Sequence, residues 1–422
     1  MSSEKIGQQL QHIFNHTSLQ RCNAYSKNIF SQLHRCHTAA MGMHYYKCDD
    51  KNCNHVHQQY HSCGNRHCPN CGGLKKQQWI ETLTAQLFAT SYYHVVFTIP
   101  HEFNSLILGN RKEMFTLLFE AASQTLLQFG KDEKYLGATC GITAVLHTWG
   151  QDLSFHPHLH CIVSGGGILP SPLDGEGQGV RRWVEAKRKN DKFLFPVNAM
   201  KQVYKGIFLK KLRMLLAKGH LHTEGIAVEE QIQQAGYKSW NVYAKAPFGS
   251  VSSVVEYLGR YTHKVAITRH RIVSITDADV TFRYKDYSDG NQQKEMTLSI
   301  AEFLRRFEIH FLPKRYVKIR HYGFLQNHGK TKRLNAVRQA MKLQPLPPKV
   351  QVPVALRMLE QYGEDITLCP KCKQGRLQLI AIIYPWQRVV RIPGKTTGTG
   401  EQVMPRNKAS PQEPGRVSPK KK

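Results

Sequence analysis

The sequence lacks any apolar run long enough to cross a membrane. Its longest apolar runs, Tyr92–Pro100 and Leu377–Trp386, are well short of the roughly 20 residues that a membrane helix needs. The N-terminus, MSSEKIGQQLQ, is polar and carries mixed charges, whereas a secretory signal needs a basic start followed by an apolar stretch. We therefore expect a cytoplasmic protein with no membrane partner.

Acidic residues are also scarce. Aspartate and glutamate number 30 against 59 lysines and arginines, which gives a net charge of +29. An excess of this size attracts polyanions and predicts nucleic acid as the partner. An acidic membrane surface has the right sign too, but the sequence shows no long basic amphipathic helix or lipidation signal. Hydrophobic residues make up 41% of the 422 residues, which excludes wholesale disorder and allows two or three domains.

Cysteines are abundant and clustered, with seven of the eleven before residue 72. Disulfide frameworks are typical of small secreted proteins, so metal binding is the better interpretation here. The short-spaced pairs Cys48/Cys53 and Cys68/Cys71 can each direct two thiolates toward one ion, and a structural zinc needs four such ligands. The spacing predicts that these four cysteines hold one Zn²⁺ that folds the module.

Other potential zinc ligands are left over by this assignment. Cys36, Cys63 and His67 either complete a second zinc site or pack as ordinary side chains. A second knuckle, Cys369-Pro370-Lys371-Cys372, has no partner pair nearby in the sequence. A lone pair of this kind is as typical of a turn as of half a metal site.

Four histidines lie in the segment GITAVLHTWGQDLSFHPHLHCIVSGGG, residues 141–167. Read as two antiparallel strands, the segment places His158 and His160 on one face, because side chains alternate with period two. His147 on the first strand can point to the same face. Three such imidazoles form a partial metal shell with positions open for substrate oxygens. His156 shares the face as an alternate ligand or orienting group, although any one of these histidines alone would read as a core residue.

Residues 250–267 predict a helix that carries Tyr257 and Tyr261 four positions apart on one face, with Lys264 beside them. A phenolate that attacks a phosphodiester forms a covalent aryl phosphate, which conserves the bond for a later rejoining step. Lys264 could stabilise the phenolate or the phosphate charge. Alone, the tyrosine pair would read as an aromatic stripe in the core, and the histidines make the catalytic interpretation preferable.

The histidine and tyrosine motifs together resemble the HUH endonuclease superfamily, and closely the two-tyrosine transposases of the IS91 family. The residues that carry the resemblance are His158-Leu159-His160 and Tyr257-Leu258-Gly259-Arg260-Tyr261. The phrases HTWGQDLSFHPHLHCIV, YLGRYTHKVAI, LPKRYVKIRHYGFL and SCGNRHCPNC also resemble this family. The similarity covers most of residues 30–330.

The resemblance implies an α+β fold: a ferredoxin-like (RRM-like) HUH palm with an antiparallel sheet and flanking helices, plus a small N-terminal zinc module. It implies a catalytic Mg²⁺ or Mn²⁺ on His158 and His160. The third ligand is His147 if the chain follows the relaxases, while other branches use Gln, Glu or Asp. Tyr257 and Tyr261 match the nucleophile pair, and the phrase ending in Lys264 resembles the YxxK motif of replication initiators.

The implied function is that of a DNA transposase. Such an enzyme nicks and rejoins single-stranded DNA at element ends and target through 5′-phosphotyrosine intermediates, in rolling-circle transposition of an insertion sequence. A plasmid rolling-circle replication initiator or relaxase would use the same chemistry at an origin. A non-catalytic zinc-dependent nucleic-acid-binding protein is the alternative from a different class.

Residues 305–333 hold nine lysines and arginines and one acidic residue, with Tyr316, Tyr322 and Phe324 interleaved. This pattern is suited to phosphate contacts with base stacking, although a merely solvated basic face has the same composition. The candidate DNA-binding residues are Arg260, Arg315, Lys318, Arg320 and Tyr322.

The composition divides the chain into four expected segments. They are a helical lead-in with the zinc module (1–90), the catalytic domain with its basic C-terminal portion (91–345), a small region with the CPKC knuckle (346–391) and a disordered basic tail (392–422).

Overall fold

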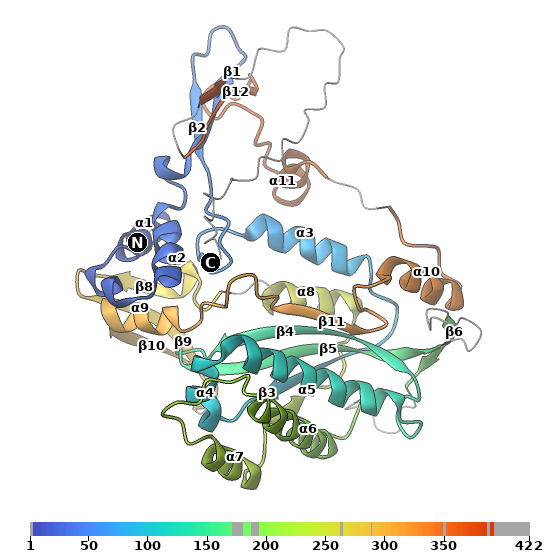
Figure 1. The fold of residues 1–422 in the computed structure, drawn as a ribbon. Coiled ribbons are helices and arrows are strands. Elements are labelled where there is room, and N and C mark those ends of the chain that lie inside the picture. The colour runs from blue at the N-terminus through green and yellow to red at the C-terminus, as the bar shows by residue number, and fades with distance from the viewer. Residues whose placement is uncertain are drawn as a thin grey trace, which may run out of the picture.

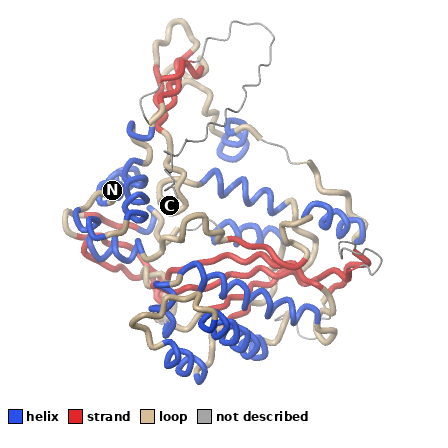
Figure 2. The backbone as a smooth tube through the Cα atoms, viewed as in Figure 1, coloured by secondary structure: helices blue, strands red, loops and turns tan. Residues whose placement is uncertain are grey.

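The computed structural model describes residues 3–170, 180–186, 194–261, 265–287, 289–348, 352–385 and 389–391. The predicted tail 392–422 lies outside these ranges, and the four-segment division of the chain stays a prediction. The fold is mixed α/β with antiparallel sheets (Figures 1 and 2). Within the described ranges, we find no helix with the length and apolar character that a bilayer crossing requires.

A large antiparallel sheet forms the centre of the molecule. Its strands, in spatial order, are β11 (Ile319–Gly323), β4 (Thr139–Trp149), β5 (Phe155–Pro170), β3 (Tyr92–Thr98) and β7 (Val242–Ala244), and β6 (Val180–Glu185) pairs with the far end of β5. Between β3 and β4 run helices α4 (Asn104–Gly109) and α5 (Arg111–Lys131); between β5 and β7 run α6 (Val197–Ala217) and α7 (Val228–Tyr237). The chain order is therefore β-α-β-β-α-β around the strand order β7-β3-β5-β4.

The two faces of this sheet differ because side chains alternate along each strand. Ala144 and Leu146 of β4 and Leu159 and Cys161 of β5 are buried in the main hydrophobic cluster, together with side chains of α5 and α6. The opposite face carries the histidines. Figure 1 shows α3 (Gly73–Thr84) and α8 (Val251–Tyr261) over that face, with α5 and α6 on the other. The strand β3 is buried almost throughout, as expected for a strand covered on both sides.

The N-terminal helices α1 (Ser3–Ile13) and α2 (Ala24–Arg35) pack on a second sheet. That sheet has the order β10-β9-β8 and is followed by α9 (Ile300–Glu308); its strands are β8 (Ile272–Ile275), β9 (Asp279–Asp286) and β10 (Gln292–Ser299). Phe14, Phe30 and Phe307 lie in one buried cluster, with the Phe14 and Phe307 rings 5.6 Å apart. The start of the chain therefore shares a hydrophobic core with residues that follow α8.

A third sheet stands away from the rest of the molecule at the top of Figure 1. It has the order β13-β12-β1-β2 and consists of β1 (Met43–Cys48), β2 (Val56–Tyr60), β12 (Leu377–Ile383) and β13 (Val389–Arg391). The remaining helices α10 (Lys330–Ala340) and α11 (Val354–Tyr362) lie between the central sheet and this one along the chain. Strands from both ends of the chain thus pair in one small sheet.

Candidate active site and metal centres

Three histidines meet on the face of the central sheet beneath α8. The register pairs His147 of β4 directly with His158 of β5, and His160 follows two residues later on the same face. One ring nitrogen of each lies within 4.8 Å of the others, and His158 Nε2 is 3.1 Å from His160 Nε2. We call these three residues the histidine cluster. The structure places them together as the strand alternation predicts.

Hydrogen bonds and packing fix the orientation of these rings. The carbonyl oxygen of His156 is 2.7 Å from Nδ1 of His158, so Nδ1–H donates to it and Nε2 keeps its lone pair toward the cluster. His147 is only 2% exposed and stacks on Trp149 with ring centroids 4.7 Å apart. The side chain of His156 is exposed and lies outside the cluster, and the contact of His156 with His158 is made by its backbone carbonyl.

Tyr257 reaches the histidine cluster from α8. Its Oη lies 2.9 Å from Nδ1 of His160 and 2.6 Å from Nε2 of His94. When Nε2 of His160 ligates a metal, Nδ1–H of the same ring can donate to the phenol oxygen, and the phenol O–H can donate to Nε2 of His94, which also lies 3.0 Å from Nδ1 of His160. Tyr257 is therefore linked to the cluster by a single imidazole ring.

His94 is a site residue that the sequence analysis missed. It lies on β3, two positions before the residue that pairs with His160, so it shares the histidine face. Burial, together with the nearby charges of Lys245 and His158, lowers the pKa of His94 to about 3. The imidazole is therefore neutral at pH 7, and its Nε2 can accept a hydrogen bond from the O–H of Tyr257. Its sequence signal was one histidine in an apolar strand, which is more typical of a core residue.

The second predicted nucleophile is placed only by its backbone. Tyr261 is the last residue of α8, one helical turn after Tyr257. The side chains of Tyr261 and Arg260 and the whole of Lys264 lie outside the described residues. Their predicted roles therefore stay predictions. The helix itself runs over Val251–Tyr261, within the expected segment 250–267.

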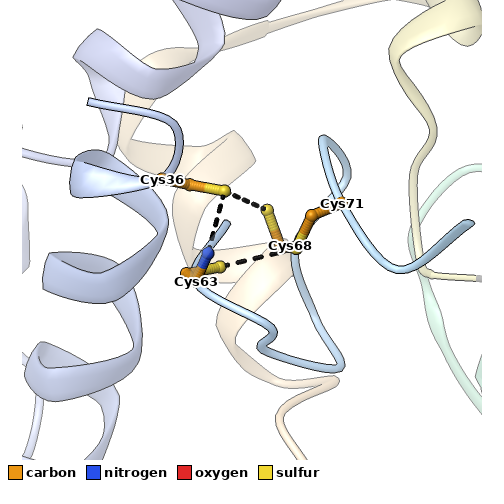
Figure 3. A group of neighbouring side chains, drawn as sticks. All are labelled: Cys36, Cys63, Cys68 and Cys71. Carbon is orange, nitrogen blue, oxygen red and sulfur yellow. Dashed lines mark hydrogen bonds between the residues drawn. The ribbon is translucent and has the colours of Figure 1, made fainter. Parts of the chain in front are cut away.

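The cysteines form two groups, and neither is the predicted quartet. Grouping Cys48 and Cys53 with Cys68 and Cys71 was wrong, because the β1–β2 hairpin carries the first pair away from the second. Cys68 and Cys71 instead meet Cys36 and Cys63 at the end of α2 (Figure 3); we call this set the first cysteine group. The second cysteine group consists of Cys48, Cys53, Cys369 and Cys372.

The first cysteine group has the geometry of a structural zinc site. Sγ of Cys36 is 3.6 Å from Sγ of Cys68, and Sγ of Cys63 is 3.6 Å from Sγ of Cys71. Four sulfurs around Zn²⁺ at a Zn–S distance of about 2.3 Å would lie about 3.8 Å apart. The sulfur positions therefore fit zinc, whereas a disulfide bond would need about 2.05 Å.

His67 is not part of either group. Its Nε2 accepts a 3.4 Å hydrogen bond from the backbone N–H of Leu312, and burial with nearby positive charges lowers its pKa to about 3. Of the two roles predicted for it, packing is the one that the structure supports. Cys36 and Cys63, by contrast, take the metal-ligand position.

The basic segment 305–333 is more buried than predicted. Tyr316 and Phe324 are 5% and 1% exposed and belong to hydrophobic clusters, so the prediction that they stack on bases was wrong. Tyr322 packs against the main cluster. The guanidinium of Arg320 lies 4.4 Å from the ring centroid of Phe119 on α5. Arg320 and Tyr322 thus lie on the face of the sheet opposite the histidine cluster.

A cleft of about 1020 Å³ lies between the cysteine turn, α3 and the start of β11. Its lining comes from the cysteine turn 64–73, Lys76 and Trp79 of α3, and residues 317–319 at the start of β11. The carbonyl of Lys318 accepts a hydrogen bond from the N–H of Leu146, next to His147. Burial and the charge of Arg66 lower the pKa of Lys318 to about 8. Among the predicted DNA-binding residues, Lys318 lines this cleft, and Arg315 is exposed nearby in the chain.

Two family profiles match the chain. One, described as "Putative transposase", matches residues 141–333 and so contains the histidine cluster and both tyrosines. The other, described as "Transposase zinc-binding domain" and built on IS91-type proteins, matches residues 6–99 and contains the first cysteine group. No solved structure gives a significant match.

Two relatives extend this similarity over most of the chain. "Putative transposase y4qJ" of Sinorhizobium fredii (strain NBRC 101917 / NGR234) is 38% identical over 378 residues, which are 87% of this chain and 91% of that protein. "Transposase for insertion sequence element IS801" of Pseudomonas savastanoi pv. phaseolicola is 31% identical over 340 residues, 79% of each chain. These matches confirm the resemblance seen in the sequence: the chain belongs to the IS91 family of transposases and carries its zinc-binding domain.

Proposed function

We propose that this transposase nicks and rejoins single-stranded DNA through 5′-phosphotyrosine intermediates, as in rolling-circle transposition of an insertion sequence. The observation that carries the proposal is the contact between the nucleophile candidate and the histidine cluster: Oη of Tyr257 is 2.9 Å from Nδ1 of His160. A phenol held there can reach a phosphate that lies against the cluster.

The topology supports a ferredoxin-like HUH palm. A β-α-β-β-α-β unit with the strand order β7-β3-β5-β4, in which α5 and α6 share one face of the sheet, is the arrangement expected of such a palm. The other face is then free to carry the reacting groups, with α8 packed over it.

His147, His158 and His160 would hold the divalent ion. Three imidazoles leave coordination positions open for phosphate oxygens. Because Mg²⁺ prefers oxygen ligands and imidazole suits transition metals, this donor set favours Mn²⁺ over Mg²⁺. When bound, such an ion supplies positive charge that polarises the scissile phosphate.

The residues of the chain then perform the transfer. The oxygen of Tyr257 attacks phosphorus while Nε2 of His94, 2.6 Å away, takes the phenol proton. The bond between phosphorus and the 3′ oxygen breaks, and that oxygen takes up a proton from water and leaves as a 3′-hydroxyl. The 5′ phosphate stays on the tyrosine. Tyr261, one turn further along α8, would serve the second cleavage.

The cleft between the cysteine turn, α3 and the start of β11 would hold part of the DNA strand. Arg66, Lys76 and Lys318 line it with positive charge, and the indole of Trp79 lines the same surface. Cationic groups with an aromatic ring suit a single strand, whose phosphates and base faces are both accessible. Action on DNA places the protein in the bacterial cytoplasm, at the nucleoid.

The test uses the full-length protein, Mn²⁺ and 3′-end-labelled single-stranded oligonucleotides that span the ends of the encoding element. We expect a labelled protein adduct on a denaturing gel from wild type and from the control Tyr243→Phe, an exposed tyrosine on β7. Tyr257→Phe combined with Tyr261→Phe should give none. An adduct that persists in the double variant, or that forms only with 5′-end label, would contradict the proposal.

The alternatives predict different outcomes of the same assay. A replication initiator or relaxase would nick a plasmid origin and leave the element ends intact; the transposase relatives favour the ends. A non-catalytic DNA-binding protein would bind these oligonucleotides without nicking them under any metal condition.

A further inference from the structure

The small sheet β13-β12-β1-β2 joins two segments that are far apart in the chain. On one side β1 pairs with β2, and on the other it pairs with β12, in a register that runs from Met43↔Ile383 to Cys48↔Leu377. The Cys48–Cys53 turn follows β1, and the CPKC knuckle precedes β12. Antiparallel pairing therefore brings both turns to the same end of the sheet.

The four sulfurs of the second cysteine group all lie within 4.8 Å of one another, as ligands of one zinc ion would. Sγ of Cys48 is 3.7 Å from Sγ of Cys372, and Sγ of Cys53 is 3.8 Å from Sγ of Cys369. These distances match the edge of about 3.8 Å expected around Zn²⁺ with Zn–S bonds of about 2.3 Å. Cys48, Cys53 and Cys369 are at most 7% exposed, so the sulfurs face one another rather than solvent.

The backbone of the two turns holds the sulfurs in place. In the CPKC knuckle, the N–H of Lys373 donates to the carbonyl of Cys369 at 2.9 Å, and the N–H of Gly375 donates to Sγ of Cys372 at 3.3 Å. In the other turn, the N–H of Cys53 donates to the carbonyl of Asp50 at 3.0 Å. An N–H group directed at sulfur stabilises a thiolate, the form of cysteine that binds metal.

Gly375 marks how closely the two turns approach. A Cβ atom there would lie 2.4 Å from Sγ of Cys48 and 2.8 Å from Cβ of Asp50. No side chain fits in that space without displacing a sulfur. Glycine at position 375 therefore allows the knuckle to approach Cys48, which lies more than 300 positions away in the chain.

The small sheet has little else to stabilise it. Among the described residues, its buried cluster consists of Cys48, Cys53 and Cys369, with Cys372 and Leu377 packed against them. The side chains of β2 are mostly exposed. A sheet with so small an apolar core needs a metal or another cross-link to be stable.

We propose that the second cysteine group binds a structural Zn²⁺ of its own, which fastens residues 43–60 to residues 364–385. Two of its ligands, Cys369 and Cys372, lie outside both matched family regions, 6–99 and 141–333. The zinc module is thus completed by the C-terminal part of the chain. The strands of the central sheet lie between the two pairs of zinc ligands along the chain. Four thiolates leave no open position, so the site is structural.

The first experiment measures zinc content and cysteine alkylation in the wild-type protein. We expect two zinc ions per chain. Iodoacetamide should modify Cys369 and Cys372 slowly in the zinc-loaded protein and rapidly, together with Cys48 and Cys53, after treatment with a strong chelator. Equal alkylation rates for Cys369 and Cys372 before and after chelation, or iron in place of zinc, would overturn the proposal.

The second experiment removes the C-terminal ligands. Cys369→Ser with Cys372→Ser should lower the zinc content from two ions to one, whereas the control Cys22→Ser, outside both groups, should keep two. Retention of two zinc ions by the double variant would contradict the proposal. Because these measurements involve no DNA, their outcome is independent of the nicking assay.

Discussion

The histidine cluster and the two cysteine groups are all sets of metal-ligating side chains, but they are built differently. His147, His158 and His160 project from two adjacent strands of one sheet and offer three neutral donors. Each cysteine group offers four sulfurs from turns, and the second gathers them from opposite ends of the chain. The histidine cluster leaves coordination positions of a bound metal open to a substrate, whereas each cysteine group encloses its metal.

This difference indicates a division of labour. Where three imidazoles project from adjacent strands and one of them lies 2.9 Å from a phenol, a bound ion can act on a phosphate beside that phenol. Where four thiolates surround the ion, the free energy of metal binding stabilises the folded state. Substitutions at the histidines should therefore remove activity and keep the fold, and substitutions at the cysteines should remove bound zinc and lower stability.

The largest expected effect is that of His160→Ala. This change removes both a metal ligand and the link to Tyr257, so we expect the nicking rate to fall by about 10³-fold or more. Zinc content and melting temperature should stay near wild type. Single-turnover nicking and metal analysis on one preparation check both statements. A loss of zinc in this variant would break the distinction between the two kinds of site.

Next comes the first cysteine group. Cys36 and Cys68 belong to the same buried cluster as Phe14 and Phe307, so Cys63→Ser with Cys71→Ser should unfold more than the turn itself. We expect the loss of one zinc ion and about 4 kcal/mol of stability, measured by urea unfolding with Cys22→Ser as control. The corresponding change at Cys369 and Cys372 should loosen only the small sheet; an equal global loss would contradict this contrast.

His94→Gln should give a smaller effect on activity. Glutamine keeps a polar group near Tyr257 but cannot take up its proton, so the nicking rate should fall by about 10²-fold. DNA binding, measured by fluorescence anisotropy, should not change. If binding weakens in proportion to the rate, His94 contributes to the shape of the site and not to proton transfer.

The smallest expected effect concerns a buried histidine outside the cluster. Burial lowers the pKa of His310 from 6.5 to about 3, so the folded protein keeps it neutral while the unfolded chain protonates it below about pH 6.5. Stability should therefore fall as the pH drops below 6.5, by about 1.4 kcal/mol per pH unit from this residue. His310→Gln should be less stable at pH 7 but lose stability less steeply between pH 6 and 4. Identical slopes in urea unfolding would contradict the assignment.

The sequence predicted the parts of the site that depend on local geometry. His158 and His160 share a face because strand side chains alternate, and Tyr257 and Tyr261 share a helix because they are one turn apart. These relations hold for any strand or helix, whatever packs against it. The family resemblance followed from the same residues, and the matched relatives confirm it.

The parts that depend on tertiary contacts could not be predicted in the same way. Cys48 and Cys53 meet Cys369 and Cys372 only because β12 pairs with β1, and spacing within the chain carries no sign of that pairing. His94 acquires its role when β3 is placed beside β5. Tyr316 and Phe324 looked available for stacking because their neighbours are basic, but both rings are buried in hydrophobic clusters that form only in the folded chain.

The most direct test of the division of labour removes the exchangeable metal alone. Brief treatment with EDTA should strip the open histidine cluster and leave both enclosed zinc ions in place. We expect the treated protein to retain two zinc ions per chain, to form no adduct with single-stranded DNA, and to recover adduct formation when Mn²⁺ is added. Undiminished adduct formation after the treatment, or recovery only when lost zinc is restored, would contradict it.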